Sequence, residues 1–211
     1  MRRLLLPVAG LLFLAGVVAG QNTIVLLNHQ LNCESTGNLC TQPFKEWLPS
    51  AICQNATAVS AWSTPTSNPA VFSCNTGSNT QKGIAEFADA ADLSMQTALW
   101  LPADWSSTVD VRLRWYTSAT TGSVVWQVQT ICVADAETSD PALNAASTVT
   151  DAAKGTTLQD NDAAITTLTV TGCAAGELLY LKVRRDAAHA SDDLAATAVL
   201  RGIELTYRRA I

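Results

Sequence analysis

Val109-Asp110-Val111-Arg112-Leu113-Arg114-Trp115-Tyr116 is the stretch that decides the fold class. Valine, leucine and tryptophan occupy every second position, and mostly polar or charged residues stand between them. Successive side chains of a β-strand point to opposite faces of its sheet, so this alternation predicts a strand with one buried face. Residues 124–133 repeat the pattern after a short polar connection typical of a hairpin. We therefore expect Trp115 and Trp126, both on the apolar side, in the core.

Shorter segments of the same kind occupy much of the remaining chain. The alternating runs lie at 164–170, 179–184 and 199–208, and two short apolar runs at 84–87 and 97–101 are further candidates. Beyond the first 20 residues no sustained apolar repeat of helical period occurs. Several short strands separated by turn residues predict an all-β sandwich or barrel of antiparallel sheets.

The region before this pattern has a different composition. Residues 20–82 hold four of the six cysteines and most of the prolines, which favour loops over continuous strands. One early strand is expected at 23–27 and a short helical turn at 44–48. The sequence thus predicts three parts: a signal peptide at 1–19, a loop-rich, disulfide-tied segment at 20–82 and the β-sandwich at 83–211.

The first residues are typical of a secretory signal peptide. Arg2 and Arg3 precede an apolar run over residues 4–19, and the small residues Val17 and Ala19 mark a cleavage site. An uncleaved membrane anchor is the alternative, although the run is short for a membrane span. Cleavage would remove two arginines, so the net charge would change from −5 to −7. We expect a secreted or cell-surface protein without stable membrane insertion, and its acidity argues against nucleic acid as a partner.

Six cysteines in an exported chain predict disulfides. A metal site is the weaker alternative, because the chain has no Cys-x-x-Cys and His29 and His189 lie far apart in sequence. Two cysteines belong to the strand-rich region, and the other four precede residue 80. The expected pairing joins Cys132 to Cys173. The remaining four are expected to pair among themselves: Cys33, Cys40, Cys53 and Cys74.

Residues for catalysis or for a cofactor are not evident in the sequence. No Gly-x-Ser-x-Gly occurs, and the carboxylates and hydroxyl near His189 belong to one polar loop rather than to separate elements. The acidic segment 160–162 is a candidate calcium loop, with a simple turn as the alternative. We therefore expect no catalytic residues, no resident metal and no cofactor.

The tryptophans outside the alternating strands are candidate contact residues. Trp47, Trp62 and Trp105 lie in loop-like contexts, where they could stack on a glycan or contact another subunit. The face of Trp100 is ambiguous because Leu99 and Leu101 flank it.

The early strand is a candidate for exchange between subunits. It is uncharged and free of proline, and its apolar residues are Ile24, Val25, Leu26 and Leu27. A strand that is apolar on both faces has to be covered on both. Residues 21–28 are therefore expected either to add to a neighbouring subunit or to fold back into their own sandwich.

A series of short motifs from residue 80 to 208 resembles a jelly-roll family of tailed-phage virion proteins and metagenomic phage-like proteins. The series reads Glu86-Phe87-Ala88, Leu101-Pro102-Ala103-Asp104-Trp105, Val124-Val125-Trp126, Ser147-Thr148-Val149-Thr150-Asp151, Ala174-Ala175-Gly176-Glu177-Leu178, Val183-Arg184-Arg185-Asp186, Asp192-Asp193-Leu194 and Leu200-Arg201-Gly202-Ile203-Glu204. The resemblance implies an antiparallel jelly-roll β-sandwich with a structural or adhesive role. The signal peptide and the cysteines depart from that family, which implies use of the fold in an exported protein.

Two functions follow as expectations, neither of them enzymatic. The first is a secreted structural subunit that self-associates into a homo-oligomer or filament, or decorates a virion-like or other multimeric surface structure. The alternative is a carbohydrate-binding or adhesion module with glycans as partners. An enzyme is the third and weakest choice.

Overall fold

A computed structural model of the chain describes residues 21–26, 29–34, 40–77 and 79–210. The chain divides into two compact units, one comprising residues 1–42 and 210–211 and the other residues 43–209. The second unit is an antiparallel β-sandwich of the jelly-roll kind, and no helix occurs among the described residues. No described helix is therefore available to span a membrane.

The larger sheet of the sandwich is built around the long strand β14. Its strands are β14 (Ala198–Ala210), β9 (Trp105–Tyr116), β12 (Asn161–Ile165), β7 (Gln81–Phe87), β6 (Val71–Thr76) and β3 (Cys40–Pro49). β9 pairs with one edge of β14, and β12 pairs with the other edge of β9. On its opposite edge β14 pairs with β7 at its beginning and with β3 further along. β6 closes this side by pairing with β7.

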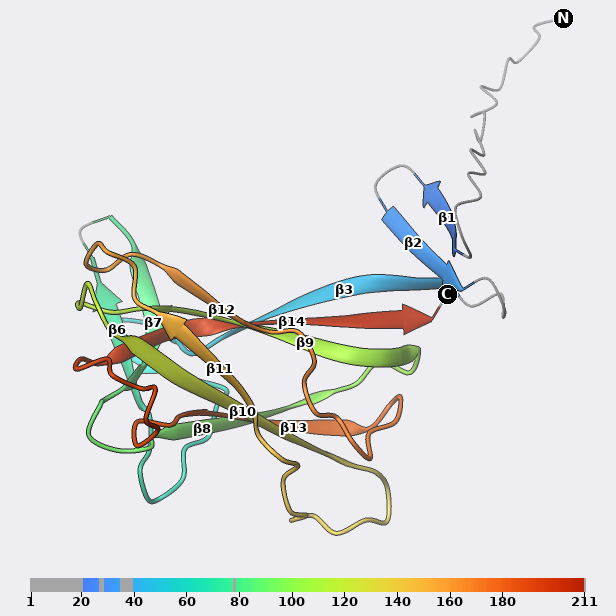
Figure 1. Cartoon of the computed structure of the whole chain (residues 1–211). Helices are drawn as coiled ribbons and strands as arrows, with labels where there is room; N and C mark the ends of the chain where they lie inside the picture. Colours follow the sequence, from blue (N-terminus) through green and yellow to red (C-terminus); the bar gives the residue numbers. More distant parts are fainter. Residues whose placement is uncertain (1–20, 27–28, 35–39, 78, 211) are drawn as a thin grey trace, which may run out of the picture. The chain divides into compact units, whose positions relative to one another are not determined.

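The smaller sheet lies opposite and has four strands in the order β11-β10-β13-β8. They are β11 (Ser147–Ala152), β10 (Ser123–Val133), β13 (Leu178–Arg185) and β8 (Ser94–Trp100). A separate two-stranded hairpin joins β4 (Ile52–Gln54) to β5 (Thr57–Val59). Figure 1 shows β9 and β14 in one layer and β8 and β13 in the other.

Most connections cross from one sheet to the other, which is the jelly-roll pattern. The chain changes layer between β7 and β8, between β8 and β9, and between β9 and β10. It changes layer again at each step from β11 to β14. The hairpin expected between 109–116 and 124–133 is therefore wrong, because β9 and β10 belong to opposite sheets. Both strands keep their alternation, since each has one face on the shared core.

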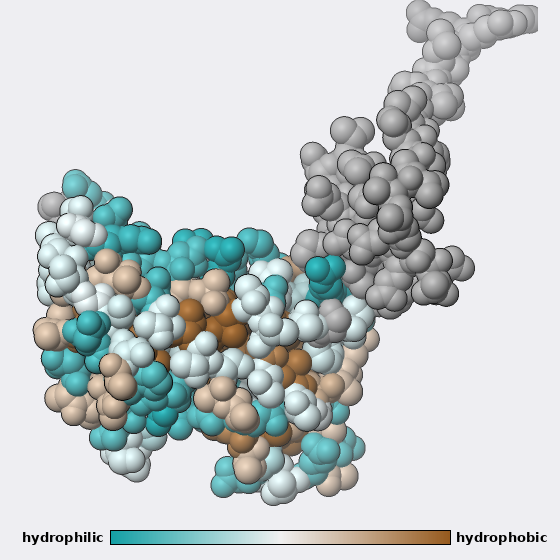
Figure 2. Space-filling model, viewed as in Figure 1, coloured by the Kyte–Doolittle hydropathy of each residue, from teal (hydrophilic) through white to brown (hydrophobic). Residues whose placement is uncertain are grey.

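The core lies between the sheets, as the alternation predicts. Trp115 and Trp126 are fully buried and meet edge to face, with ring centroids 6.2 Å apart. Burying two such rings removes a large apolar area from water and contributes strongly to stability. Trp115 Nε1 also donates a 2.7 Å hydrogen bond to Asp151 Oδ2. Figure 2 shows the hydrophobic residues gathered in a band between the two more hydrophilic layers.

The expected domain boundary after residue 82 does not match the fold. β7 crosses that point, and its partner β6 lies entirely before it. The sandwich unit begins at Pro43. The helical turn expected at 44–48 is part of strand β3, because pairing with β14 supplies hydrogen bonds that local sequence cannot reveal.

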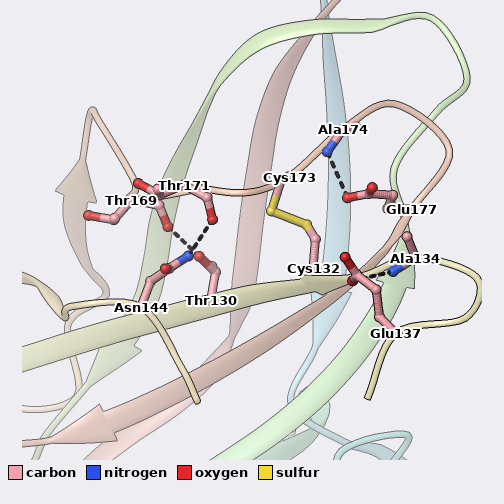
Figure 3. Close-up of a disulfide and its surroundings, with 10 residues drawn as sticks. All are labelled: Thr130, Cys132, Ala134, Glu137, Asn144, Thr169, Thr171, Cys173, Ala174 and Glu177. Carbon is pink, nitrogen blue, oxygen red and sulfur yellow. Dashed lines mark hydrogen bonds between the residues drawn. A yellow bond between two sulfur atoms is a disulfide. The ribbon is translucent and has the colours of Figure 1, made fainter. Parts of the chain in front are cut away.

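Two disulfides tie the sandwich unit together. Cys132 pairs with Cys173, as predicted, and Cys53 pairs with Cys74 within the N-terminal group of four. Figure 3 shows the first bridge at the end of β10, where Asn144 Nδ2 also donates to the carbonyl of Thr171 at 2.9 Å. The connection from β12 to β13 is thereby held against β10 by covalent and polar contacts.

The other unit contains a short antiparallel ladder. β1 (Gln21–Leu26) pairs with β2 (His29–Glu34), and the first residues of β3 pair with β2. The candidate exchange strand therefore pairs within its own chain at Ile24, Val25 and Leu26, while Leu27 lies outside the described residues. Cys33 and Cys40 are direct register partners.

Candidate functional site

The outward face of the smaller sheet is the candidate site. On β13, Leu179, Leu181 and Val183 are fully buried in the core. Side chains alternate along a strand, so Tyr180 and Lys182 must point away from the core. The neighbouring strands follow the same alternation in register, which makes one continuous outward surface.

The chemistry of this surface changes along the strands. Register partners on β8, β13 and β10 form rows across this face. The first row places Trp100 beside Leu178 and Val133. Further rows lie about 7 Å apart, the distance covered by two strand residues. The second row is Ala98, Tyr180 and Ile131, the third is Gln96, Lys182 and Gln129, and the fourth is Ser94, Arg184 and Gln127. The surface is thus apolar and aromatic at one end and rich in amides and cations at the other.

Trp100 is the most exposed large apolar side chain of the described chain. Its side chain is 69% exposed. An indole left in water gives up the free energy that its burial would contribute. A large exposed apolar side chain therefore marks a candidate interaction site. Pairing with Leu178 fixes the backbone of Trp100 at the end of β8, while its ring stays open to solvent.

A pocket of about 570 Å³ opens on this face at the edge formed by β8. Its lining includes Gln96 and Ala98 from β8 and Tyr180 and Lys182 from β13. The second wall comes from Ala61 and residues 63–65, which belong to the connection between β5 and β6. Its volume lies within the range of known ligand pockets.

A short backbone bridge builds that second wall. Ser63 and Gln96 exchange two hydrogen bonds, at 2.7 and 2.8 Å, so residue 63 extends the sheet beyond β8. Trp62, the residue before it, turns inward and donates from Nε1 to the carbonyl of Pro49 at 3.0 Å. The wall is therefore anchored by a buried indole.

The polar end of the face is held by a network around Arg184. Its guanidinium donates to Gln127 Oε1 at 2.5 Å and contacts carboxylate oxygens of Asp92 at 3.4 Å and Asp186 at 3.6 Å. Asp186 also accepts a hydrogen bond from Gln127 Nε2. Charge-assisted contacts of this kind orient the amide and fix its polar atoms on the surface.

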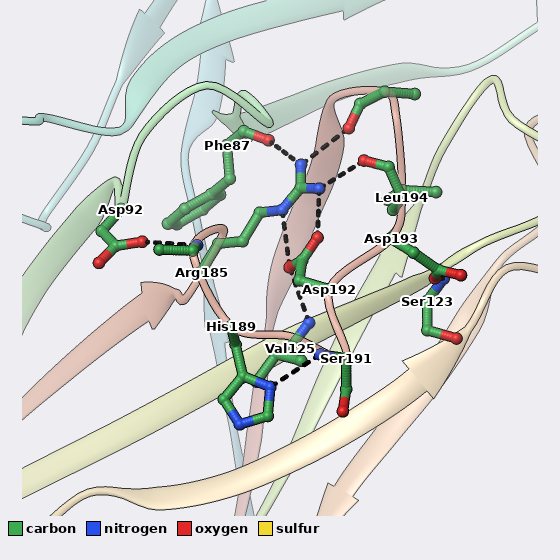
Figure 4. Close-up of polar contacts among 12 residues, drawn as sticks. Phe87, Asp92, Ser123, Val125, Arg185, His189, Ser191, Asp192, Asp193 and Leu194 are labelled. Atoms are coloured by element: carbon green, nitrogen blue, oxygen red, sulfur yellow. Dashed lines mark hydrogen bonds and ion pairs between the residues drawn. The ribbon is translucent and has the colours of Figure 1, made fainter.

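The loop that supplies Asp186 is anchored from below by Arg185. Its side chain is fully buried. Asp192 accepts hydrogen bonds from two of its nitrogens, at 2.7 and 3.1 Å. The remaining donors reach the carbonyls of Phe87, Ala196 and Leu194. Figure 4 shows this fan of bonds beneath the loop that carries His189. A buried charge with every donor used is a rigid support.

The outward face of the larger sheet has the opposite character. Four of its cations have acidic partners: Lys45 pairs with Glu204, Arg112 and Arg114 share Asp162, and Arg201 pairs with Asp160. Trp47, 49% exposed, covers Gly202 so closely that a Cβ there would stand 2.7 Å from the indole. On this face four cations are ion-paired and the exposed indole is packed against the sheet.

Titratable groups with shifted pKa values lie outside the pocket. Burial, reinforced by the charge of Glu46, raises the pKa of Tyr207 to about 12. Burial also raises the pKa of Tyr116. The hydrogen bond from Arg209 lowers the pKa of Asp104, and the same contact raises the pKa of Arg209. None of these four groups lines the pocket.

The three tryptophans predicted as contact residues lie in three different environments. Trp47 is exposed, but on the other sheet. Trp62 is 6% exposed, so its prediction as a contact residue is wrong: the bridge at Ser63 turns it inward. Trp105 starts β9 and is partly buried against the core. The structure does not bring them together into one platform.

The carboxylates of the acidic segment 160–162 are paired with arginines. Asp160 pairs with Arg201, and Asp162 pairs with Arg112 and Arg114, so arginines already neutralise both carboxylates. Within the described residues no cluster of three metal-binding side chains forms. His189 is exposed, and its Nδ1 accepts a bond from the Ser191 amide.

Sequence reasoning missed the residues that line the pocket. The alternation of β13 does place Tyr180 and Lys182 opposite the apolar positions, which was the available signal. It could not reveal that Trp100 shares their face or that residues 61–65 stand beside them, because both facts depend on pairing between distant strands.

No known family model matches the sequence, and no curated protein is significantly similar to it. Among solved structures, it is similar to the isomalto-dextranase of Arthrobacter globiformis T6 complexed with panose, at 19% identity and a TM-score of 0.45. That match covers 78% of this chain, which spans only 23% of the dextranase.

Two smaller structures are matched over most of their length. The CBM35 from Cellvibrio japonicus Abf62 is 13% identical, with 77% of this chain and 92% of that chain covered and a TM-score of 0.42. The family 11 carbohydrate-binding module of Clostridium thermocellum is 8% identical, with 75% and 95% covered and a TM-score of 0.41. The resemblance to phage virion proteins stays a prediction. At these identities residue roles do not transfer, and function has to be inferred from this chain's own side chains.

Proposed function

We propose that this protein is a secreted, non-catalytic glycan-binding module whose binding surface is the outward face of β8, β13 and β10. The observation that carries the proposal is the exposed Trp100, which lies on the same outward face as a pocket lined by Tyr180, Lys182 and Gln96. The four cysteines bonded in the sandwich fit an oxidising, extracellular setting.

The surface matches the two-sided chemistry of a sugar ring. A pyranose presents apolar C–H groups on its faces and hydroxyls around its rim. An exposed indole can cover such a face, while glutamine, lysine, serine and tyrosine side chains offer hydrogen bonds to the rim. From Trp100 to Gln96 the face runs roughly 13 Å along β8, which is longer than one sugar ring.

The lining residues favour binding over hydrolysis. A glycosidase places two carboxylates across its cleft. None of the described residues that line this pocket is acidic, and none is a histidine. The groups present can hold a glycan but lack a proton donor paired with a nucleophile or base.

The assembly role expected first from the sequence gains no support from the described residues. Of its two grounds, the resemblance to phage virion proteins stays a prediction, and the apolar early strand β1 pairs with β2 of the same chain. Self-association therefore stays a prediction, separate from the glycan site.

The proposal is tested by replacing Trp100 with alanine. Binding to a panel of soluble polysaccharides is measured by affinity electrophoresis, and the best ligand is followed by calorimetry. We expect Trp100→Ala to weaken binding about tenfold or more, equivalent to at least ~1.4 kcal/mol.

Trp47→Ala is the matched control, because it removes an exposed indole from the opposite sheet. It should bind like the wild-type protein. Equal binding by wild type and Trp100→Ala, or no binding to any polysaccharide, would contradict the proposed function.

A further inference from the structure

The pocket has a charge opposite to that of the protein. The chain carries 18 acidic and 13 basic residues, a net charge of −5. The residues lining the pocket nevertheless include one cation, Lys182, and no carboxylate. In an acidic protein, a pocket that is lined by a cation and by no carboxylate offers a local site for an anion.

Lys182 also differs from most of the described cations. Carboxylates lie within 4 Å of Lys45, Arg112, Arg114, Arg184, Arg185, Arg201 and Arg209. Lys182 has no such partner among the described side chains, and no hydrogen bond from its ammonium is formed within them. Its row neighbours are Gln96 and Gln129, which are uncharged.

The contrast with Arg184, in the next row, sharpens the point. Arg184 is two residues away on the same face and has both Asp92 and Asp186 as counter-charges. The acids on this face therefore gather around Arg184, and Lys182 is left as the cation available to a ligand.

An unpaired ammonium favours an anionic ligand for a physical reason. A ligand that covers Lys182 removes water from its ammonium group. This loss of hydration costs free energy unless the ligand supplies a negative charge in its place. Lysine has three donors and no acceptor, so a carboxylate or sulfate satisfies it better than neutral hydroxyls do. A neutral glycan would leave the charge uncompensated.

Resting on the proposed function, we infer that the ligand of this site is an acidic glycan whose carboxylate or sulfate group binds Lys182. Trp100 and Tyr180 then contact the apolar parts of the sugar chain, and Lys182 selects for charge. Binding weakens as salt is raised, because the contact lies at a solvent-accessible surface.

The test compares charged and neutral ligands of matched length. Oligogalacturonates carry carboxylates, sulfated galactans carry sulfates, and neutral galactans carry neither. We expect wild-type protein to bind at least one acidic ligand tenfold or more tightly than the neutral one. Lys182→Gln should remove that preference, and Lys182→Arg should retain most of it.

Lys154→Gln is the control, since it makes the same charge change at an exposed position outside the pocket. It should bind like wild type. Lowering the pH below about 3.5 protonates a uronate and should abolish binding through a carboxylate, whereas binding through a sulfate should persist.

The outcomes separate this inference from the proposed function. Tight binding to neutral galactan that depends on Trp100 but is unchanged in Lys182→Gln would overturn the inference and leave the glycan-binding function standing. Equal losses in Lys182→Gln and Lys154→Gln would also overturn it. Binding to neutral polysaccharides of the panel but to neither acidic ligand would overturn the inference alone, whereas binding to no polysaccharide at all would defeat both.

Discussion

At the scale of single residues, Arg185 shows how a buried charge can order a surface loop. Its side chain is fully buried together with that of Asp192, and all of its donors have acceptors. Asp192 in turn accepts a bond from the amide of Val125, which ties the loop to β10. The polar end of the candidate site depends on this support, because Asp186 follows Arg185 directly.

We expect Arg185→Met to lower the free energy of unfolding by about 3–5 kcal/mol, because it leaves Asp192 buried without its counter-charge. Arg112→Met is the control. It removes an exposed ion pair whose acid, Asp162, keeps Arg114, so the cost should stay below about 1 kcal/mol. Urea unfolding followed by circular dichroism measures both, and similar costs would contradict the assigned role of Arg185.

At the scale of elements, the disulfide Cys132–Cys173 connects β10 to the end of the connection between β12 and β13. Its two cysteines are 41 positions apart in sequence, and those of the Cys53–Cys74 bridge are 21 positions apart. A cross-link stabilises the folded state chiefly by restricting the unfolded chain, and the effect grows with the length of the loop it closes.

Replacing Cys132 and Cys173 together by alanine should therefore lower the free energy of unfolding by up to about 4 kcal/mol. Replacing Cys53 and Cys74 should cost roughly 0.6 kcal/mol less, as the shorter loop predicts. Denaturant unfolding under non-reducing conditions measures the two effects. Peptide mapping that joined Cys132 to Cys53 or Cys74 would contradict the pairing itself.

At the scale of the whole molecule, the chain consists of a sandwich unit and a small unit that contains β1 and β2. The pocket and the network around Arg184 and Arg185 belong entirely to the sandwich unit. β1 pairs with β2 of the same chain, in the unit outside the sandwich, and exchange of this strand between subunits stays a prediction.

We therefore expect deletion of residues 21–28 to leave both the oligomeric state and glycan binding unchanged. Light scattering after size-exclusion chromatography measures the first, and affinity electrophoresis the second. Oligomers in the full chain that disappear in a deletion variant with an intact sandwich would instead support exchange of this strand between subunits.

The sequence by itself determined the properties that depend on local order. The period of two at 109–116 and 179–184 predicted strands and assigned their inner faces, and Trp115 and Trp126 are buried as expected. This works because the alternation of side chains is a property of each strand alone. The grouping of cysteines likewise led to the pair Cys132–Cys173.

Only the tertiary structure decided which strands are neighbours and hence what the surface can bind. Whether Trp100 faces solvent depends on its pairing with β13, and the inward turn of Trp62 depends on a bridge between Ser63 and Gln96. Arg184 is neutralised by Asp92, 92 positions earlier in the chain, while Lys182 is not. Such contacts join distant segments, so their outcome follows from sheet register and packing rather than from any local pattern of residues.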